Sequence, residues 1–183
     1  SKSKRNIVDP VAIIESYGAD TARLFMLSDS PPERDLEWTV SGIEGAWRYS
    51  NKLWRLISEP GGPLAQLGDP KPVDMDKIAQ EAFRSIHKSI SHVTGDLEGF
   101  RFNRAVAHIR ELTNFLGELN GSDTDMAWVR RFGFETVAKL IGPLMPHLAE
   151  EIWHWLGHRT LLACEPWPEV ESELLADEIV TIA

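Results

Sequence analysis

The chain has 183 residues and a mass of 20.6 kDa, and its 19 basic and 28 acidic side chains give a formal net charge of −9. This length supports one ordinary domain, or a domain plus a fragment, and the charge excludes an even basic coat for nucleic acids. The single cysteine, Cys164, excludes an internal disulfide and a multi-cysteine zinc site. Because no apolar run is long enough to span a bilayer, we expect a cytoplasmic protein.

The acidic charge is concentrated in the last third of the chain. Residues 121–183 hold 4 basic and 11 acidic side chains, whereas residues 1–60 hold 8 and 9 and residues 61–120 hold 7 and 8. The first two thirds are therefore nearly neutral, and the basic clusters within them are candidates for contact with an anionic partner.

Two short helices are predicted near the start of the chain. Asp9 before Pro10 is the pattern of an N-cap followed by a first-turn proline, so we expect a helix that runs to Tyr17 and stops at a glycine. Asp20 is predicted to cap a second helix over residues 21–28. This helix ends where a serine and two prolines favour extended backbone.

Four or five longer amphipathic helices are predicted beyond residue 39, from apolar residues spaced three and four apart. The expected apolar stripes contain, in chain order, Val40, Ile43, Trp47, Trp54 and Ile57; Ile78, Ala82, Ile86, Ile90, Val93 and Leu97; and Ile109, Leu112, Leu116 and Leu119. Asn103 is expected to cap one of these helices and either Asp123 or Ser122 another, and a last short helix is expected over residues 146–157.

This pattern predicts an all-α fold, an up-and-down helical bundle. We expect connecting helices in residues 1–38, the bundle in residues 39–157, and a loop with a short strand in residues 158–183. The strand is predicted from the β-branched run over residues 179–182, which lacks a visible partner. We therefore expect that the chain is a piece of a longer protein.

The first candidate site is the N-terminal run Ser1-Lys2-Ser3-Lys4-Arg5-Asn6, which alternates hydroxyl groups with cations. Such a segment can wrap a polyphosphate, because lysine places a point charge beside oxygens that gain charge during phosphoryl chemistry. The alternative is a solvated basic tail, which is common at chain ends and which composition alone favours.

Several motifs resemble those of the class I aminoacyl-tRNA synthetases. Ser1-Lys2-Ser3 resembles the end of the Lys-Met-Ser-Lys-Ser signature of that class. The runs at 17–27, 30–38 and 143–153 closely resemble the leucyl-tRNA synthetase family of the bacterial type, and the resemblance covers nearly the whole chain. The isoleucyl, valyl and methionyl families of the same subclass are alternatives, and the run at 30–38 favours the leucyl family.

The resemblance implies the role of a ligase that activates leucine with ATP and magnesium and transfers it to tRNA(Leu). Lys2 would stabilise the pyrophosphate leaving group. The residues that the resemblance places at ATP are Ser1, Lys2 and Ser3, and those that it places at tRNA are Lys4, Arg5 and Asn6. The His-Ile-Gly-His signature and the Rossmann half of the family are missing, so we expect the isolated chain to be inactive and to hold no cofactor. The parent enzyme is expected to be a monomer.

The second candidate site lies at the start of the helix predicted after Phe102. Arg104 and His108 are four residues apart and follow Arg101, so the three can face phosphates while the apolar stripe packs inward. The alternative is a solvated helix face. The resemblance implies that the bundle lies along the anticodon stem of tRNA, and we predict no base-specific pocket there. The residues that could add a contact are Trp128, which is more typical of a core anchor, Arg130 and Arg131.

The third candidate is the group Glu150, His154 and His158, spaced by four residues near the end of the last helix. Histidines at i and i+4 can share a metal ion, but histidines also suit a helix C-terminus, and the resemblance requires no metal. We therefore predict no metal site. Most of the seven tryptophans are expected in the core. The rival function is a non-enzymatic helical interaction module whose acidic last third binds a basic partner.

Overall fold

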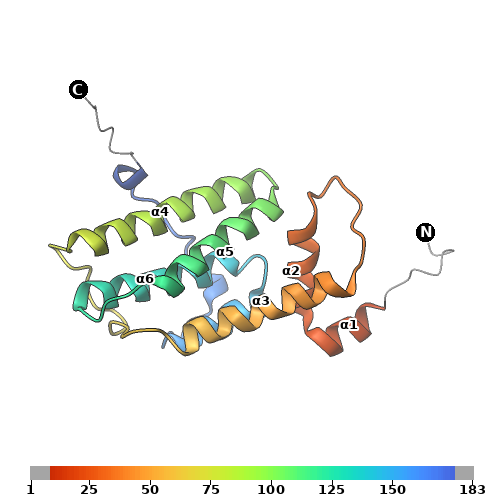
Figure 1. The fold of residues 1–183 in the computed structure, drawn as a ribbon, viewed down its shortest axis with the longest axis horizontal. Helices are drawn as coiled ribbons and strands as arrows, with labels where there is room; N and C mark the ends of the chain where they lie inside the picture. Colours follow the sequence, from red (N-terminus) through yellow and green to blue (C-terminus); the bar gives the residue numbers. More distant parts are fainter. Residues whose placement is uncertain (1–8, 176–183) are drawn as a thin grey trace, which may run out of the picture.

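The computed structural model describes residues 9–175 of the chain. This part contains seven α-helices and two short 3-10 helices and, within the described residues, no strand, which confirms the predicted all-α class (Figure 1). The strand expected over residues 179–182 lies outside the described residues. None of the helices in this part combines the length and the apolar character needed to cross a membrane.

Two short helices, α1 (Pro10–Tyr17) and α2 (Ala19–Asp29), form a corner at one end of the molecule (Figure 1). The Asp9 side chain accepts a hydrogen bond from the backbone N–H of Val11 at 3.0 Å, which confirms the predicted N-cap of α1. Gly18 joins the two helices with a φ of 84°, a left-handed conformation that glycine adopts without steric cost.

Asp20 does not cap α2, contrary to the prediction. Its carboxylate accepts a hydrogen bond from the backbone N–H of Leu148 at 2.7 Å and lies 2.8 Å from Nδ1 of His147. Both partners lie in the first turn of α7 (Pro146–Trp155), whose own N-cap residue, Met145, supplies no side-chain hydrogen bond. Asp20 therefore satisfies a free N–H group of a distant helix and ties the N-terminal corner to the bundle.

Four long helices form the bundle: α3 (Val40–Ser58), α4 (Lys77–Glu98), α5 (Phe102–Glu118) and α6 (Thr124–Ile141). Helices α4 and α5 form a hairpin, α6 packs against both, and α3 lies along the edge beside α2, α5 and α7 (Figure 1). One continuous core joins all of them. Its fully buried aliphatic side chains include Leu53, Ile57, Ile86, Ile90, Val129, Leu140 and Ile152. Each such side chain contributes about 1.5–3 kcal/mol relative to its exposed state.

The predicted apolar stripes are correct over most of each helix but wrong at a few large residues. Val40, Trp47 and Ile78 are exposed. In two of these cases the neighbouring alanine faces the core instead, Ala46 beside Trp47 and Ala79 beside Ile78. A small residue permits close approach of a neighbouring helix, but it gives a weak hydrophobic signal in the sequence. The outward position of Trp47 matters for the site described below.

After α7 the chain returns across α6, and its last described residues pack against α4. We call residues 158–175 the C-terminal strap; it contains two 3-10 helices, Leu162–Cys164 and Ser172–Leu175. The indole N–H of Trp167 donates a hydrogen bond to Oγ1 of Thr94 at 2.8 Å and so fixes the strap to α4. Helix α3 lies along the other edge of the bundle (Figure 1).

Candidate nucleic-acid interface

The first predicted site lies outside the described residues. It consists of Ser1, Lys2, Ser3, Lys4, Arg5 and Asn6.

The second predicted site is brought together around a buried acid. Nε of Arg101 donates a hydrogen bond to Oδ1 of Asp96 at 2.8 Å, and Nε of Arg104 lies 3.5 Å from the same oxygen. Nε2 of His108 lies 3.4 Å from Oδ2 of Asp96. Helix periodicity thus placed the three side chains on one side, but the acid at their centre, in the last turn of α4, was not foreseen.

Asp96 offsets part of this positive charge and shapes the turn between α4 and α5. Arg101 also donates to the carbonyl oxygen of Gly95 at 2.8 Å, and its guanidinium fills the space that a side chain at Gly99 would occupy. Arg101 is therefore held within the turn. Arg104 is 62% exposed, which makes it the more accessible of the two arginines.

Arg130 cannot contact a partner, which corrects one option that the sequence left open. Its side chain is 1% exposed. The guanidinium donates hydrogen bonds to the carbonyl oxygens of Pro63 at 2.7 Å, Leu119 at 3.2 Å and Gly121 at 3.0 Å. It therefore ties the connector before α4 to the loop between α5 and α6. The partners that hold Arg131 in a similar way are Ala65, Glu135 and Leu156.

Trp128 packs as the predicted core anchor. Its ring stacks on Phe132 with 5.4 Å between centroids and an interplanar angle of 6°. Its indole N–H donates a hydrogen bond to the carbonyl oxygen of Asp69 at 3.0 Å, so the polar end of the side chain is also satisfied within the fold.

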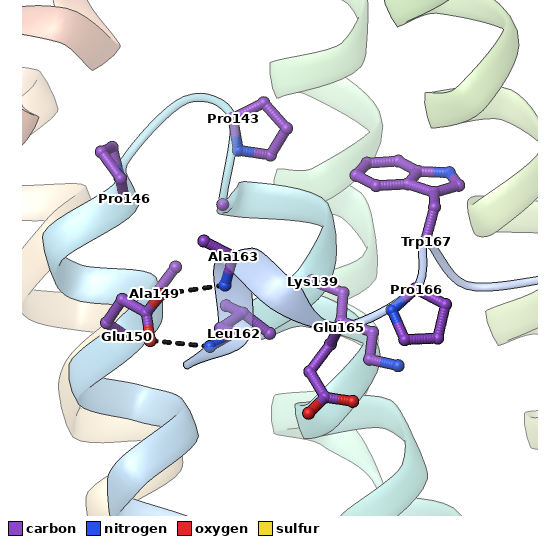
Figure 2. A pocket seen from close by; sticks show the side chains of 11 residues that line it. Lys139, Pro143, Pro146, Ala149, Glu150, Leu162, Ala163, Glu165, Pro166 and Trp167 are labelled. Carbon is purple, nitrogen blue, oxygen red and sulfur yellow. Dashed lines mark hydrogen bonds between the residues drawn. The ribbon is translucent and has the colours of Figure 1, made fainter. Parts of the chain in front are cut away.

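Glu150, from the third candidate group, holds the C-terminal strap. Its two carboxylate oxygens accept hydrogen bonds from the backbone N–H groups of Leu162 at 2.8 Å and Ala163 at 2.9 Å (Figure 2). The same residues line a pocket of about 280 Å³ between α6, α7 and the strap, with Trp167 on its far wall. The carboxylate thus caps the first 3-10 helix of the strap.

The histidines of the third group do not share one environment. His158 stacks on Trp153 with 3.4 Å between ring centroids, and its Nε2 lies 3.0 Å from Oε1 of Glu135. His154 is exposed on α7. The ring stack and the carboxylate contact give His158 a structural role at the end of α7.

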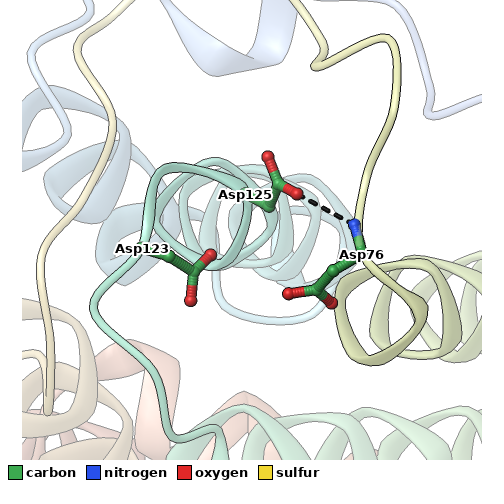
Figure 3. A group of neighbouring side chains, drawn as sticks. All are labelled: Asp76, Asp123 and Asp125. Carbon is green, nitrogen blue, oxygen red and sulfur yellow. Dashed lines mark hydrogen bonds between the residues drawn. The ribbon is translucent and has the colours of Figure 1, made fainter.

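Three other carboxylates, those of Asp76, Asp123 and Asp125, lie within 4.8 Å of one another (Figure 3). Helix capping explains this arrangement. Asp76 accepts a hydrogen bond from the N–H of Ala79, and Asp123 accepts one from the N–H of Met126, each at 2.8 Å. The carboxylate of Asp125 accepts a hydrogen bond from the backbone N–H of Asp76 at 2.9 Å. The hydrogen bond from Met126 is the main reason that the pKa of Asp123 lies below its usual value.

The outward face of α3 carries a basic groove that the sequence analysis missed. We call it the α3 groove; it has a volume of about 560 Å³, and its lining residues are Trp47, Arg48, Asn51, Lys52, Arg55, Leu56 and Glu59. The signal in the sequence was the spacing of its three cations, Arg48, Lys52 and Arg55. Residues at i, i+4 and i+7 share one side of a helix. This signal was overlooked because Trp47 was assigned to the buried stripe.

The chain matches two families of tRNA ligase modules. Residues 79–183 match the family described as the anticodon-binding domain of tRNA ligase, and residues 1–39 match the class I tRNA synthetases for I, L, M and V. The first match covers more than half of the chain. The chain therefore belongs to the anticodon-binding domain family of tRNA ligases.

The curated relatives that align with the whole chain include tRNA ligases named for one amino acid, leucine. The leucine–tRNA ligases of Paramagnetospirillum magneticum and Rhodospirillum rubrum are 57% and 54% identical over 183 residues, which are 100% of this chain and 21% of each relative. The chain thus spans about a fifth of the length of these relatives. The predicted resemblance to leucyl-tRNA synthetases is confirmed.

A solved structure supports the fold in the same way. The crystal structure of a ternary complex of Agrobacterium radiobacter LeuRS, tRNA and LeuAMS is similar with a TM-score of 0.78 and 29% identity. The match covers 96% of this chain and 23% of that chain. The helical bundle described above is therefore the arrangement seen in that synthetase.

Proposed function

We propose that this chain is the tRNA-binding helical part of a leucine–tRNA ligase of class I. The observation that carries the proposal is the similarity to leucine–tRNA ligases over the entire chain. The whole protein would activate leucine with ATP and transfer it to tRNA(Leu) in the cytoplasm, as a monomer. The isolated chain would bind tRNA without catalysing the reaction, because it matches the class I synthetase family over residues 1–39 alone.

The three regions of the chain would have different roles. Residues 1–38 would close the catalytic part, residues 39–157 would form the tRNA-binding bundle, and residues 158–183 would lead to a further domain. Lys2 would stabilise the pyrophosphate that leaves ATP, with magnesium sharing the charge, and Ser1 and Ser3 would flank it. The bundle would orient the tRNA, and correct orientation of a reacting group contributes strongly to rate.

The proposed tRNA contacts lie at two places. Lys4, Arg5 and Asn6 would meet the tRNA near the active site. Arg101, Arg104 and His108 would meet it at the turn between α4 and α5, where the exposure of Arg104 supports a direct phosphate contact. Contacts of this kind read the shape and backbone of duplex RNA rather than its bases.

A titration of the chain with leucine tRNA at two salt concentrations tests the proposal. We expect binding at about 50 mM salt that weakens steeply by about 200 mM, because phosphate contacts release counterions. The rival function is an interaction module for a basic partner, and the acidic last third of the chain is the observation that favours it. A chain that does not bind tRNA even at low salt would refute the tRNA-binding role and favour that module.

A further inference from the structure

We infer that the α3 groove is an RNA-binding surface, in which Arg48, Lys52 and Arg55 contact phosphates and Trp47 packs against a base. This inference rests on the proposed function, because it names the surface of the chain that would meet the tRNA. It adds a site on α3, which lies along the opposite edge of the bundle from α4, the helix against which residues 172–175 pack (Figure 1).

The three cations of the groove remain available to an anion. Arg48 is 65% exposed, and its ion pair with Glu44, at 3.8 Å, is a surface pair that a phosphate can replace at little cost. Nζ of Lys52 donates to Oδ1 of Asn114 on α5 at 2.7 Å, a neutral acceptor that orients the ammonium group without cancelling its charge. Within residues 9–175, no hydrogen bond or ion pair engages the guanidinium of Arg55.

The spacing of these cations suits a polyanion. Residues 48 to 55 span about 10 Å along the helix, at a rise of about 1.5 Å per residue. A double helix carries about one phosphate charge per 1.7 Å of its axis, so three cations over this length can each reach a separate phosphate. A single small anion would contact only one of the three cations, so their spacing favours a polyanion.

Trp47 adds an aromatic surface to the groove. It is 46% exposed, whereas Ala46 beside it takes the core position. An exposed indole next to cations is the combination with which proteins stack unpaired nucleic-acid bases along a bound backbone, so Trp47 would meet an unpaired base beside the phosphates that the cations contact. The neighbouring Asn51 donates to the carbonyl oxygen of Trp47 at 2.8 Å, which holds this part of the groove in place.

Two other described surfaces, the turn between α4 and α5 and the last third of the chain, suit an RNA backbone less well. At the turn between α4 and α5, the buried Asp96 pairs with Arg101 and Arg104. In the last third of the chain, Arg130 is buried, and the exposed side chains of the strap include Glu169, Glu171 and Glu173. The α3 groove combines accessible cations with an exposed aromatic ring, which favours RNA as its partner.

Two double variants of equal charge test the inference in the 183-residue chain. R48Q/R55Q removes two cations from the groove, and K77Q/R159Q removes two exposed cations elsewhere. With labelled leucine tRNA at about 0.1 M salt, each lost phosphate contact should weaken binding about 8-fold, so R48Q/R55Q should lose about 60-fold. Its salt slope should also fall by about 2, whereas K77Q/R159Q should stay within about 2-fold of the unchanged chain.

Trp47 is tested by W47A and W47F. We expect W47A to weaken tRNA binding roughly 10-fold with an unchanged salt slope, and W47F to retain most of the affinity because it keeps a stacking ring. Circular dichroism melts of all variants establish that they fold. W47F that loses as much affinity as W47A, with both folded, would overturn the stacking role.

The outcomes separate this inference from the proposed function. If the unchanged chain binds tRNA and both double variants bind equally well, the α3 groove is not the RNA surface, although the tRNA-binding role stands. If the unchanged chain does not bind tRNA at low salt, the proposed function itself fails. If R48Q/R55Q loses binding to polyglutamate but not to tRNA, the groove is a protein-docking surface and the inference is wrong.

Discussion

Replacement of the buried Arg130 by methionine should unfold the chain more readily. Methionine has similar length but no donor, so Arg130→Met removes three hydrogen bonds to the carbonyl oxygens of Pro63, Leu119 and Gly121. Hydrogen bonds to charged groups contribute about 1.5–3 kcal/mol each. These carbonyls lie near the surface and can regain water, which reduces the loss to about 1 kcal/mol per bond. We expect a loss of about 3 kcal/mol in the free energy of unfolding.

Urea unfolding followed by circular dichroism measures this loss. Arg130→Lys should lose less, about 1–2 kcal/mol, because one ammonium group keeps the charge but cannot match the planar fork of guanidinium donors. The matched control is Arg159→Met, an exposed arginine whose replacement should change stability by no more than about 0.5 kcal/mol. A loss below about 1 kcal/mol for Arg130→Met would refute the reasoning that Arg130 joins the two loops.

Three further predictions concern other parts of the chain. Asp20→Ala should destabilise the fold by about 1 kcal/mol in urea unfolding, because the first turn of α7 loses its distant cap; no loss would contradict that role. Burial lowers the pKa of His87 below 6.5, so the unfolded chain takes up the proton first. Stability should therefore fall as the pH drops from about 6.5 toward the folded pKa, and His87→Phe should flatten this part of the curve; an unchanged curve would exclude His87 as the cause. In the intact enzyme, Lys2→Ala should slow leucine-dependent pyrophosphate exchange without changing the unfolding midpoint, and unchanged exchange would rule out the role proposed for Lys2.

Local rules predicted the helix caps where both partners are close in sequence. Asp9 and Asp123 cap their own helices as expected, because the acceptor and the N–H groups lie within three residues of each other. Asp20 was assigned wrongly, because its partner is 128 residues away. Asn103 was also assigned wrongly, since it lies inside α5, which begins at Phe102 and has no side-chain cap. Such partners are set by tertiary packing, which a local pattern does not contain.

The candidate site was predictable to a similar extent. Helical spacing correctly brought Arg101, Arg104 and His108 to one side, since Arg104 and His108 are one turn apart on α5 and Arg101 directly precedes that helix. Asp96 was missed because it belongs to the preceding helix, α4. Only the turn between α4 and α5 brings its carboxylate next to these three side chains. The α3 groove was missed for a different reason, because size alone assigned Trp47 to the core, whereas the helix packs through its smaller neighbour.

The most direct test of the account follows the indole N–H signals of the seven tryptophans by NMR while leucine tRNA is added at low salt. Trp47 is exposed in the α3 groove, whereas Trp128 and Trp167 donate hydrogen bonds to Asp69 and Thr94 near α4 and α6. We predict that the Trp47 signal shifts or broadens as tRNA binds, while those of Trp128 and Trp167 stay in place. A Trp47 signal that does not respond would contradict the central claim that this bundle binds tRNA along α3.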